Sequence, residues 1–233
     1  GNRLRPRGFA DRAAHLVSRA GLAVEVLDEE RIAAMEMGLL LGVARGSEEP
    51  PRLLVIRHDP DNAPSRPVLG LVGKGVTFDT GGLSIKSSEG MEQMKDDMAG
   101  GAAVVAALCA VSRLKAPIRV IGIVPIAENM PGGRAIRPGD VLTSASGKTV
   151  EVLDTDAEGR LILADALWYA RQRGATHVVD IATLTAACTI ALGHAVSGLF
   201  GRPQTWVDTV RIVADSTGDR VWPMPLVGDY LDL

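Results

Sequence analysis

Several stretches of this chain are apolar without the alternation that a half-exposed strand shows, and this pattern constrains the fold most. Residues 68–72 and 118–126 are the clearest cases. A strand that is apolar on successive positions buries both of its faces. Such stretches alternate with helical patterns, of which the Ala-rich residues 99–114 are the longest. This order predicts a three-layer αβα sandwich around a mixed, mostly parallel central sheet.

The remaining elements are predicted from periodicity, capping residues and turn residues. We expect helices over residues 9–19, 28–35, 99–114, 161–171 and 206–214, with Asp28 as the cap of the second. We expect strands over residues 22–27, 52–57, 68–72, 118–126, 149–153, 177–181 and 194–200. No interdomain linker stands out, so residues 1–233 are interpreted as one domain.

Composition excludes several classes of protein. With 46% hydrophobic and 23% charged residues, the chain can bury one sizeable core, as a soluble globular domain does. The net charge of −3 gives no electrostatic reason to expect a nucleic acid or an anionic membrane as partner. No apolar run approaches the roughly 20 residues that a membrane helix needs. Cys109 and Cys188 are isolated, which is typical of a reducing cytoplasm.

Two short stretches concentrate charged side chains. Residues 73–97 include Lys74, Asp79, Lys86 and Asp97, and residues 154–160 add Asp156 and Glu158. If four carboxylates converge, each pair about 5 Å apart repels by roughly 3 kcal/mol at an effective dielectric constant of about 20. Two divalent ions would cancel the four charges, and oxygen ligands suit Mn²⁺, Mg²⁺ or Zn²⁺ without choosing between them. We therefore predict a two-metal hydrolytic centre.

The local sequence favours buried, sharply turned backbone around these residues. Glycines at positions 73, 75, 81 and 82 let the backbone approach an ion closely. Asp156, Glu158 and Arg160 alternate, so an extended loop would aim all three side chains in one direction. A phosphate-binding loop is rejected, because that motif requires Ser or Thr directly after its Gly-Lys pair, and residue 75 is Gly.

The motifs resemble those of the leucyl (cytosol) aminopeptidases. The resemblance rests on VGKGVTFDTGGLSIK, MKDDMAGGAA and DTDAEGRLILADAL, and it extends to residues 127–133 and 182–185. It implies that Lys74, Asp79, Asp97 and Glu158 hold one metal ion, and that Asp79, Asp156 and Glu158 hold the other. Lysine can be a ligand only when deprotonated, which costs roughly 4 to 5 kcal/mol at neutral pH and which two adjacent dications could supply.

The resemblance also assigns the catalytic and substrate-binding positions. Lys86 would polarise the scissile carbonyl group, and Arg160 would bind a bicarbonate that serves as general base. Met94, Thr183 and Leu184 would contact the substrate. The implied activity is removal of the amino-terminal residue from peptides, with leucine and other apolar residues favoured. Relatives form hexamers, which implies a homo-oligomer, and the family name implies a cytoplasmic location.

Three departures from the family pattern qualify this expectation. Residue 154 is Asp where the family usually has Asn, and residue 186 is Ala where it usually has Gly. The family's catalytic domain continues beyond the position of Leu233, and a smaller domain precedes the position of Gly1. The chain is therefore interpreted as a fragment of that catalytic domain. Two alternatives stay open: a non-catalytic binding or regulatory module on the same fold, and a fragment that is inactive because it is truncated.

Overall fold

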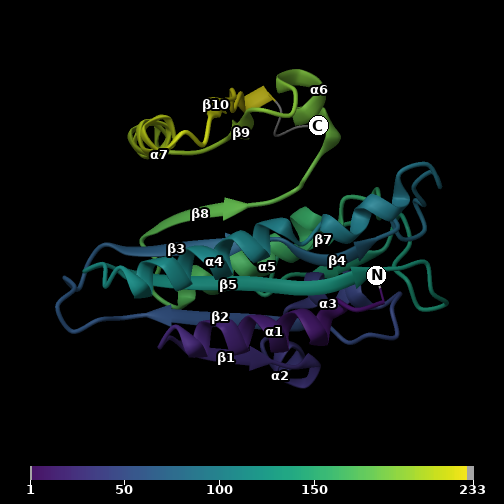
Figure 1. Cartoon of the computed structure of the whole chain (residues 1–233). Coiled ribbons are helices and arrows are strands. Elements are labelled where there is room, and N and C mark those ends of the chain that lie inside the picture. The colour runs from purple at the N-terminus through teal and green to yellow at the C-terminus, as the bar shows by residue number, and fades with distance from the viewer. Residues whose placement is uncertain (1, 230–233) are drawn as a thin grey trace. The chain divides into compact units, whose positions relative to one another are not determined.

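The computed structural model describes residues 2–229, which divide after Leu184 into two compact units. The larger unit contains the predicted metal ligands and is built around a six-stranded sheet (Figure 1). None of the helices formed by the described residues combines the length and the apolar character that crossing a bilayer requires.

The central sheet is mixed, with the order β1-β2-β5-β3-β8 and β4 paired to β5. Its strands are β1 (Ala23–Leu27), β2 (Arg52–His58), β3 (Val68–Gly73), β4 (Gly75–Asp79), β5 (Arg119–Asn129) and β8 (His177–Ile181). The pairings of β5 with β3 and β4, and of β3 with β8, are parallel. The pairings of β1 with β2 and of β2 with β5 are antiparallel. This arrangement confirms the predicted mixed, mostly parallel sheet.

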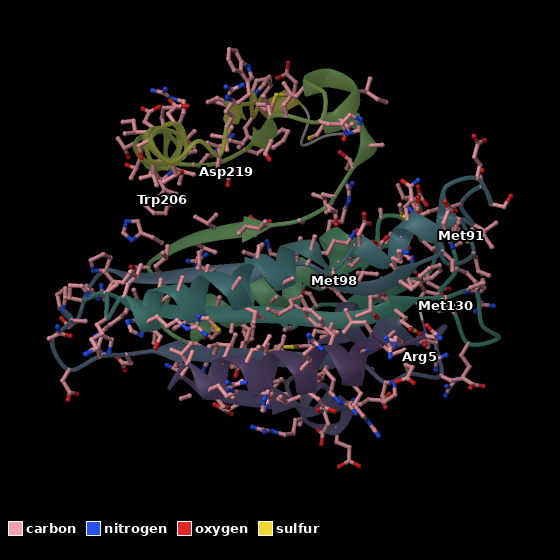
Figure 2. All side chains as sticks on the ribbon, in the orientation of Figure 1. Arg5, Met91, Met98, Met130, Trp206 and Asp219 are labelled. Carbon is pink, nitrogen blue, oxygen red and sulfur yellow. The ribbon has the colours of Figure 1, made fainter. Side chains whose placement is uncertain are left out.

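Helices cover both faces of this sheet (Figure 1), which explains the continuous apolar strands. The helices of this unit are α1 (Pro6–Arg19), α2 (Glu29–Ala34), α3 (Gly38–Ala44), η1 (Met91–Asp96), α4 (Ala99–Arg113) and α5 (Glu158–Gln172). Residues of α1 and α4 share one core with Leu54, Ile56 and Val124. Met98, labelled in Figure 2, packs against that core. Residues of α3 and α5 share the second core, on the opposite face of the sheet, with Val55 and Ile123.

Lys74 interrupts what would otherwise be one strand along β5. Strand β3 pairs with β5 residues 119–123 and β4 pairs with β5 residues 126–129. Between them, the backbone N–H of Lys74 donates to Ile181 O at 3.0 Å, and its carbonyl accepts from Gly101 N at 2.7 Å. The residue therefore leaves the β5 ladder at the carboxyl end of β3. In open α/β sheets, binding sites lie at the carboxyl ends of the parallel strands.

Helix α3 begins without a side-chain cap from its own flanking residue. Instead, the buried carboxylate of Asp165 on α5 accepts from Leu39 N and Leu40 N, each at 3.0 Å. Its other oxygen accepts from Ala145 N at 2.8 Å, in the turn of the hairpin β6 (Val141–Thr143) and β7 (Thr149–Glu151). One carboxylate thus satisfies two helix N-terminal N–H groups and joins three segments far apart in the sequence.

The smaller unit consists of short elements. These are α6 (Ala186–Leu192), β9 (Ser197–Leu199), α7 (Gln204–Thr217) and β10 (Val221–Pro223), with β9 and β10 paired in parallel. Only Val207 and Ala214 of its apolar side chains are buried among the described residues.

Most predicted elements are present, and the differences have physical reasons. Asp28 caps α2 as expected, accepting from Arg31 N at 3.1 Å. The predicted strand at residues 194–200 is shorter, at Ser197–Leu199. Helix α3 and strand β4 were not predicted, because each is a short apolar segment whose identity depends on its partner. Strand β4 replaces the turned loop expected after Gly75, since its backbone finds a ladder partner in β5.

Candidate metal centre

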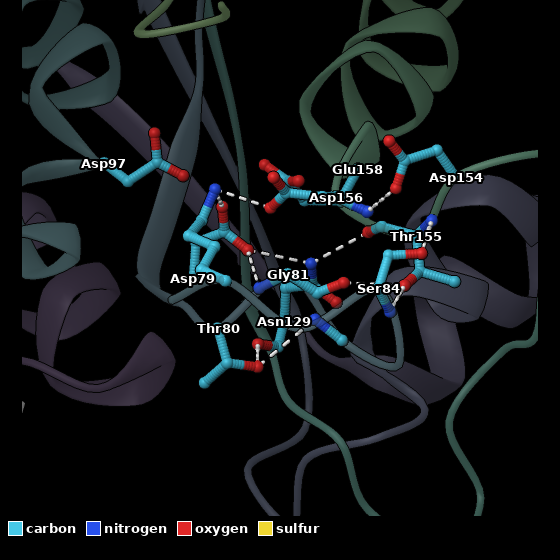
Figure 3. A network of polar contacts seen from close by, with 12 residues as sticks. Asp79, Thr80, Gly81, Ser84, Asp97, Asn129, Asp154, Thr155, Asp156 and Glu158 are labelled. Atoms are coloured by element: carbon cyan, nitrogen blue, oxygen red, sulfur yellow. Dashed lines mark hydrogen bonds and ion pairs between the residues drawn. The ribbon is translucent and has the colours of Figure 1, made fainter. Parts of the chain in front are cut away.

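The charged residues of the two stretches meet at one end of the sheet (Figure 3). Lys74 occupies the break between β3 and β4, Asp79 ends β4, and Asp97 follows η1, the short helix that Met91, labelled in Figure 2, begins. Asp156 lies just before α5, and Glu158 is the first residue of that helix. The sequence separation of up to 84 residues is closed by the parallel strands, whose carboxyl ends lie at the same edge.

Three of the four carboxylates form a tight group. Ligand oxygens of Asp79, Asp156 and Glu158 all lie within 4.8 Å of one another. Asp97 lies outside this group and is connected to it by Lys74. The Lys74 Nζ lies 2.8 Å from both oxygens of Asp97 and 2.7 Å from Glu158 Oε1. The convergence expected from the sequence is therefore present for all four carboxylates, with a lysine between Asp97 and the other three.

Lys86 lies between two carboxylates, as Lys74 does, but it contacts a different pair. Its Nζ lies 2.9 Å from Asp79 Oδ2 and 2.5 Å from Asp156 Oδ1. Its side chain is 25% exposed, against 3% for Lys74, so its ammonium group can meet a molecule arriving from solvent. Its backbone N–H is held by Thr80 O at 2.9 Å.

Burial raises the pKa of three carboxylic acids of the site, those of Asp97, Asp156 and Glu158. It raises the pKa of Glu158 to about 7, although Lys74 opposes the shift. For Lys74, burial alone would lower the pKa, but Glu158 and Asp97 outweigh it and the pKa is raised. The lysines are thus held as cations, and the acids gain from any further positive charge nearby.

The donor set fits divalent cations. With all six side chains charged, four carboxylates against two ammonium groups leave two negative charges in a largely buried site. Among residues 2–229, Asp97 Oδ2, Asp156 Oδ1 and Glu158 Oε2 are buried and accept no hydrogen bond. Asp97 Oδ2 and Asp156 Oδ1 each lie at ion-pair distance from a lysine nitrogen, but the angles are not those of a hydrogen bond. Glu158 Oε2 has neither an ion pair nor a hydrogen bond with a described residue. Metal ions coordinate buried anionic oxygens of this kind.

Polar residues without charge hold the carboxylates in place (Figure 3). Asn129, at the end of β5, donates from Nδ2 to Asp79 Oδ1 at 2.8 Å and to Thr155 O at 3.0 Å. The Thr155 hydroxyl donates to Gly81 O at 2.6 Å and accepts from Ser84 N at 2.8 Å. This network ties the segment before α5 to the segment after β4. Sequence reasoning missed Asn129 and Thr155 as site residues, although both lie in stretches that carry the family resemblance.

Two glycines permit the close approach of these segments. A Cβ at Gly159 would lie 2.8 Å from Lys74 Cε and 3.0 Å from Lys74 Nζ. Gly81 has a positive φ of 86°, and a Cβ there would lie 2.9 Å from Asp156 Oδ1. Any side chain at either position would collide with a charged group of the site.

The predicted substrate contacts lie around the same group. The Thr183 hydroxyl donates to Asp97 Oδ1 at 2.6 Å, and Thr183 O accepts from Lys74 Nζ at 2.8 Å. Leu184 is exposed at 44%, and its Cδ1 would lie 3.0 Å from a Cβ on Gly159. Met94 is half-buried on η1, which packs against β4. Thr183 and Leu184 thus reach the charged group, and the substrate role of all three residues stays a prediction.

The expected common direction of Asp156, Glu158 and Arg160 was wrong. Helix α5 begins at Glu158, so residues 158 and 160 are about 200° apart around the helix axis. Glu158 is buried, whereas Arg160 is exposed and has no ion pair or hydrogen bond with another described residue. Asp154 does not join the carboxylate group but accepts from Asp156 N at 2.9 Å, which fixes the turn before α5.

Comparison with known proteins agrees with this geometry. The family model described as "Cytosol aminopeptidase family, catalytic domain" matches residues 1–233. A probable cytosol aminopeptidase of Solibacter usitatus (strain Ellin6076) is 55% identical over 98% of this chain and 48% of its own length. One of Koribacter versatilis (strain Ellin345) is 48% identical over 100% of this chain and 46% of its own. The chain thus spans about half the length of the curated relatives it matches.

Solved structures give the same result. The bottromycin maturation enzyme BotP in complex with Mn has a TM-score of 0.93 and 43% identity, over 99% of this chain and 50% of its own. A second structure of BotP has a TM-score of 0.91 at the same identity. The identity, the coverage of this chain and the architecture all agree, and the chain therefore belongs to the cytosol aminopeptidase family, within the catalytic domain.

Proposed function

We propose that the chain carries the active centre of a two-metal aminopeptidase, which hydrolyses the amino-terminal peptide bond of peptides and favours leucine and other apolar residues. The observation that carries the proposal is the buried group of Asp79, Asp156 and Glu158, with Lys74 extending it to Asp97. The family to which the chain belongs supports peptide hydrolysis as the reaction.

In this proposal, Lys74, Asp79, Asp97 and Glu158 hold one divalent ion, and Asp79, Asp156 and Glu158 hold the other. Bound divalent ions supply positive charge that polarises a carbonyl group and makes water acidic enough to act near neutral pH. BotP, which has been solved in complex with Mn, favours Mn²⁺ as the first ion to test, with Zn²⁺ and Mg²⁺ as alternatives.

Each remaining residue has one role in this proposal. The ammonium group of Lys86, which is partly exposed beside Asp79, stabilises the negative charge that develops on the substrate oxygen. Arg160 cannot be the base, because its guanidinium stays protonated, but its planar fork can orient a bicarbonate ion that accepts the proton. Met94, Thr183 and Leu184 contact the substrate. We further propose a cytoplasmic homo-oligomer, with the hexamer as the expected form.

Hydrolysis of leucine p-nitroanilide tests this function. We expect release of p-nitroaniline that requires Mn²⁺ and stops on addition of a chelator. Lys86→Ala is expected to abolish turnover while metal content is preserved. Lys95→Ala, a change to an exposed lysine on η1, is the matched control and is expected to leave turnover unchanged. Release that persists in chelator, or full turnover by Lys86→Ala, would reject the assignment.

A further inference from the structure

A second polar cavity lies at the opposite end of the sheet from the carboxylates. It has a volume of about 310 Å³. Its lining includes Arg57 and His58 at the end of β2, Asp59 just after that strand, Ser65, Val68 in β3, Arg119, Val120 and Ile121 in β5, and Arg173 after α5. Val68 begins β3, and Lys74 directly follows the end of that strand (Figure 1). The length of the strand, about 20 Å, therefore separates the two places.

Strand register places two of these arginines on one face. Arg57 pairs with Ile121 across the β2–β5 ladder, so the two side chains point to the same side of the sheet. Arg119 precedes Ile121 by two positions and therefore points to that side as well. Ile121 belongs to the core that α5 covers, and Arg173 is the residue at which α5 ends. Three guanidinium groups thus converge from three separate elements.

The three arginines differ in how far they are already satisfied. Arg119 donates from Nε to Pro64 O at 3.1 Å and pairs with Asp59. Arg173 lies 3.7 Å from Glu25 and 5.7 Å from the centre of the Tyr169 ring. Arg57 is half-buried, and its guanidinium group makes no hydrogen bond or ion pair with any residue in 2–229. A half-buried guanidinium with free N–H groups calls for an acceptor from outside the chain.

The charge of the cavity favours an anion with more than one negative charge. Three arginines against the single carboxylate of Asp59 leave about two positive charges among the lining residues. Glu25 lies near Arg173, but its negative charge is offset by Arg31, which pairs with it at 3.3 Å. Counting both residues therefore leaves the balance unchanged. One guanidinium group can bind two phosphate oxygens through two parallel N–H donors. The cavity volume is at the lower end of the range for small-molecule sites.

We propose that this cavity is a binding site for a phosphate group, either free phosphate or a small phosphomonoester, with Arg57 as its principal donor. The site is independent of the proposed peptidase chemistry, since none of its residues belongs to the carboxylate group. Its ligand is recognised through charge and through the fork of N–H groups on Arg57 and Arg119.

Isothermal titration calorimetry with inorganic phosphate tests the proposal on chelator-treated protein, so that phosphate on metal ions gives no signal. We expect saturable binding of one phosphate, weakened at least about tenfold by Arg57→Ala, the loss of one charge-assisted donor pair. Arg57→Lys, which retains the charge but not the fork, is expected to bind with intermediate affinity. Arg12→Ala, a change to an exposed arginine on α1, is expected to bind like the unchanged protein.

A parallel titration with glycerol 3-phosphate distinguishes the two sources of the phosphate group. Tighter binding of the ester assigns the site to phosphomonoesters, and tighter binding of inorganic phosphate assigns it to the free ion. The absence of saturable binding, or equal affinity for the unchanged protein and a folded Arg57→Ala variant, would overturn the proposal. Circular dichroism establishes that the variant is folded.

Discussion

Lys74 Nζ lies 2.7 Å from Glu158 Oε1, and both side chains are almost fully buried. The backbone of Lys74 explains how a lysine comes to lie there. Because its N–H donates to Ile181 and not to β5, the chain leaves the β5 ladder between Val72 and Gly75. The Lys74 side chain extends there between Asp97 and Glu158. A break in the sheet therefore positions the charge at the centre of the site.

Replacing Lys74 by Met is expected to weaken both the metal-free fold and metal binding. The substitution leaves Asp97 and Glu158 buried without a counterion, and breaking a buried pair costs about 3 kcal/mol. Urea unfolding of chelator-treated protein measures the first effect, and Mn²⁺ titration measures the second. Lys95→Met, on the exposed side of η1, is the control. An unchanged free energy of unfolding together with unchanged Mn²⁺ affinity would contradict the role of Lys74.

Asn129 is expected to act through Asp79. Asn129→Ala removes the donor that holds Asp79 Oδ1 at 2.8 Å, and loss of such an outer contact typically lowers metal affinity 10- to 100-fold. Calorimetric titration with Mn²⁺ checks this, with Asn62→Ala in an exposed loop as control. Equal Mn²⁺ affinity of Asn129→Ala and the unchanged protein would show that Asp79 does not depend on this hydrogen bond.

Gly159→Ala tests whether helix propensity or the space that Lys74 occupies decides the effect of a side chain at position 159. Alanine in a helix is favoured over glycine by about 1 kcal/mol, so the first turn of α5 by itself would gain stability. The added Cβ would lie 2.8 Å from Lys74 Cε, however, and the lysine has to move. We expect at least a tenfold loss of Mn²⁺ affinity, of the order seen for displaced outer contacts. Gly133→Ala, where no atom lies within 4 Å of the new Cβ, is the control.

Asp165 is expected to matter for stability and not for metal binding. Asp165→Ala leaves three buried N–H donors, on Leu39, Leu40 and Ala145, without their acceptor. At about 1 kcal/mol or more for each unsatisfied group, the free energy of unfolding should fall by about 3 kcal/mol. Asp165→Asn retains part of the acceptor capacity and should lose less. Chemical denaturation measures the free energy of unfolding of each variant, with Asp96→Ala, a change to an exposed residue, as control. Equal stability of Asp165→Ala and Asp96→Ala would contradict the role of Asp165.

The sequence predicted the charges of the site better than their surroundings. Four carboxylates and two lysines near glycine-rich turns, together with the resemblance to the aminopeptidases, were enough to expect convergence. The break at Lys74 could not be predicted, since it depends on whether β5 or β8 accepts the backbone hydrogen bonds. Strand β4 and helix α3 were missed for the same reason, as each exists only against its partner.

The direction of Arg160 illustrates a different failure. Its alternation with Asp156 and Glu158 indicated one shared direction only while the segment was taken as extended. The start of α5 at Glu158 turns Arg160 to the exposed side of the helix. Asn129 and Thr155 were not selected either, because an uncharged polar residue becomes part of a site only through contacts that the fold creates.

The central claim is that paired divalent ions neutralise this group of carboxylates. A crystal of the protein soaked in Mn²⁺, with anomalous scattering measured at the manganese edge, tests it most directly. The account predicts two anomalous peaks per chain, one beside Lys74 and Asp97 and one beside Asp156, with Asp79 and Glu158 contacting both. A map with no peak at these side chains, or with manganese only elsewhere on the chain, would contradict it.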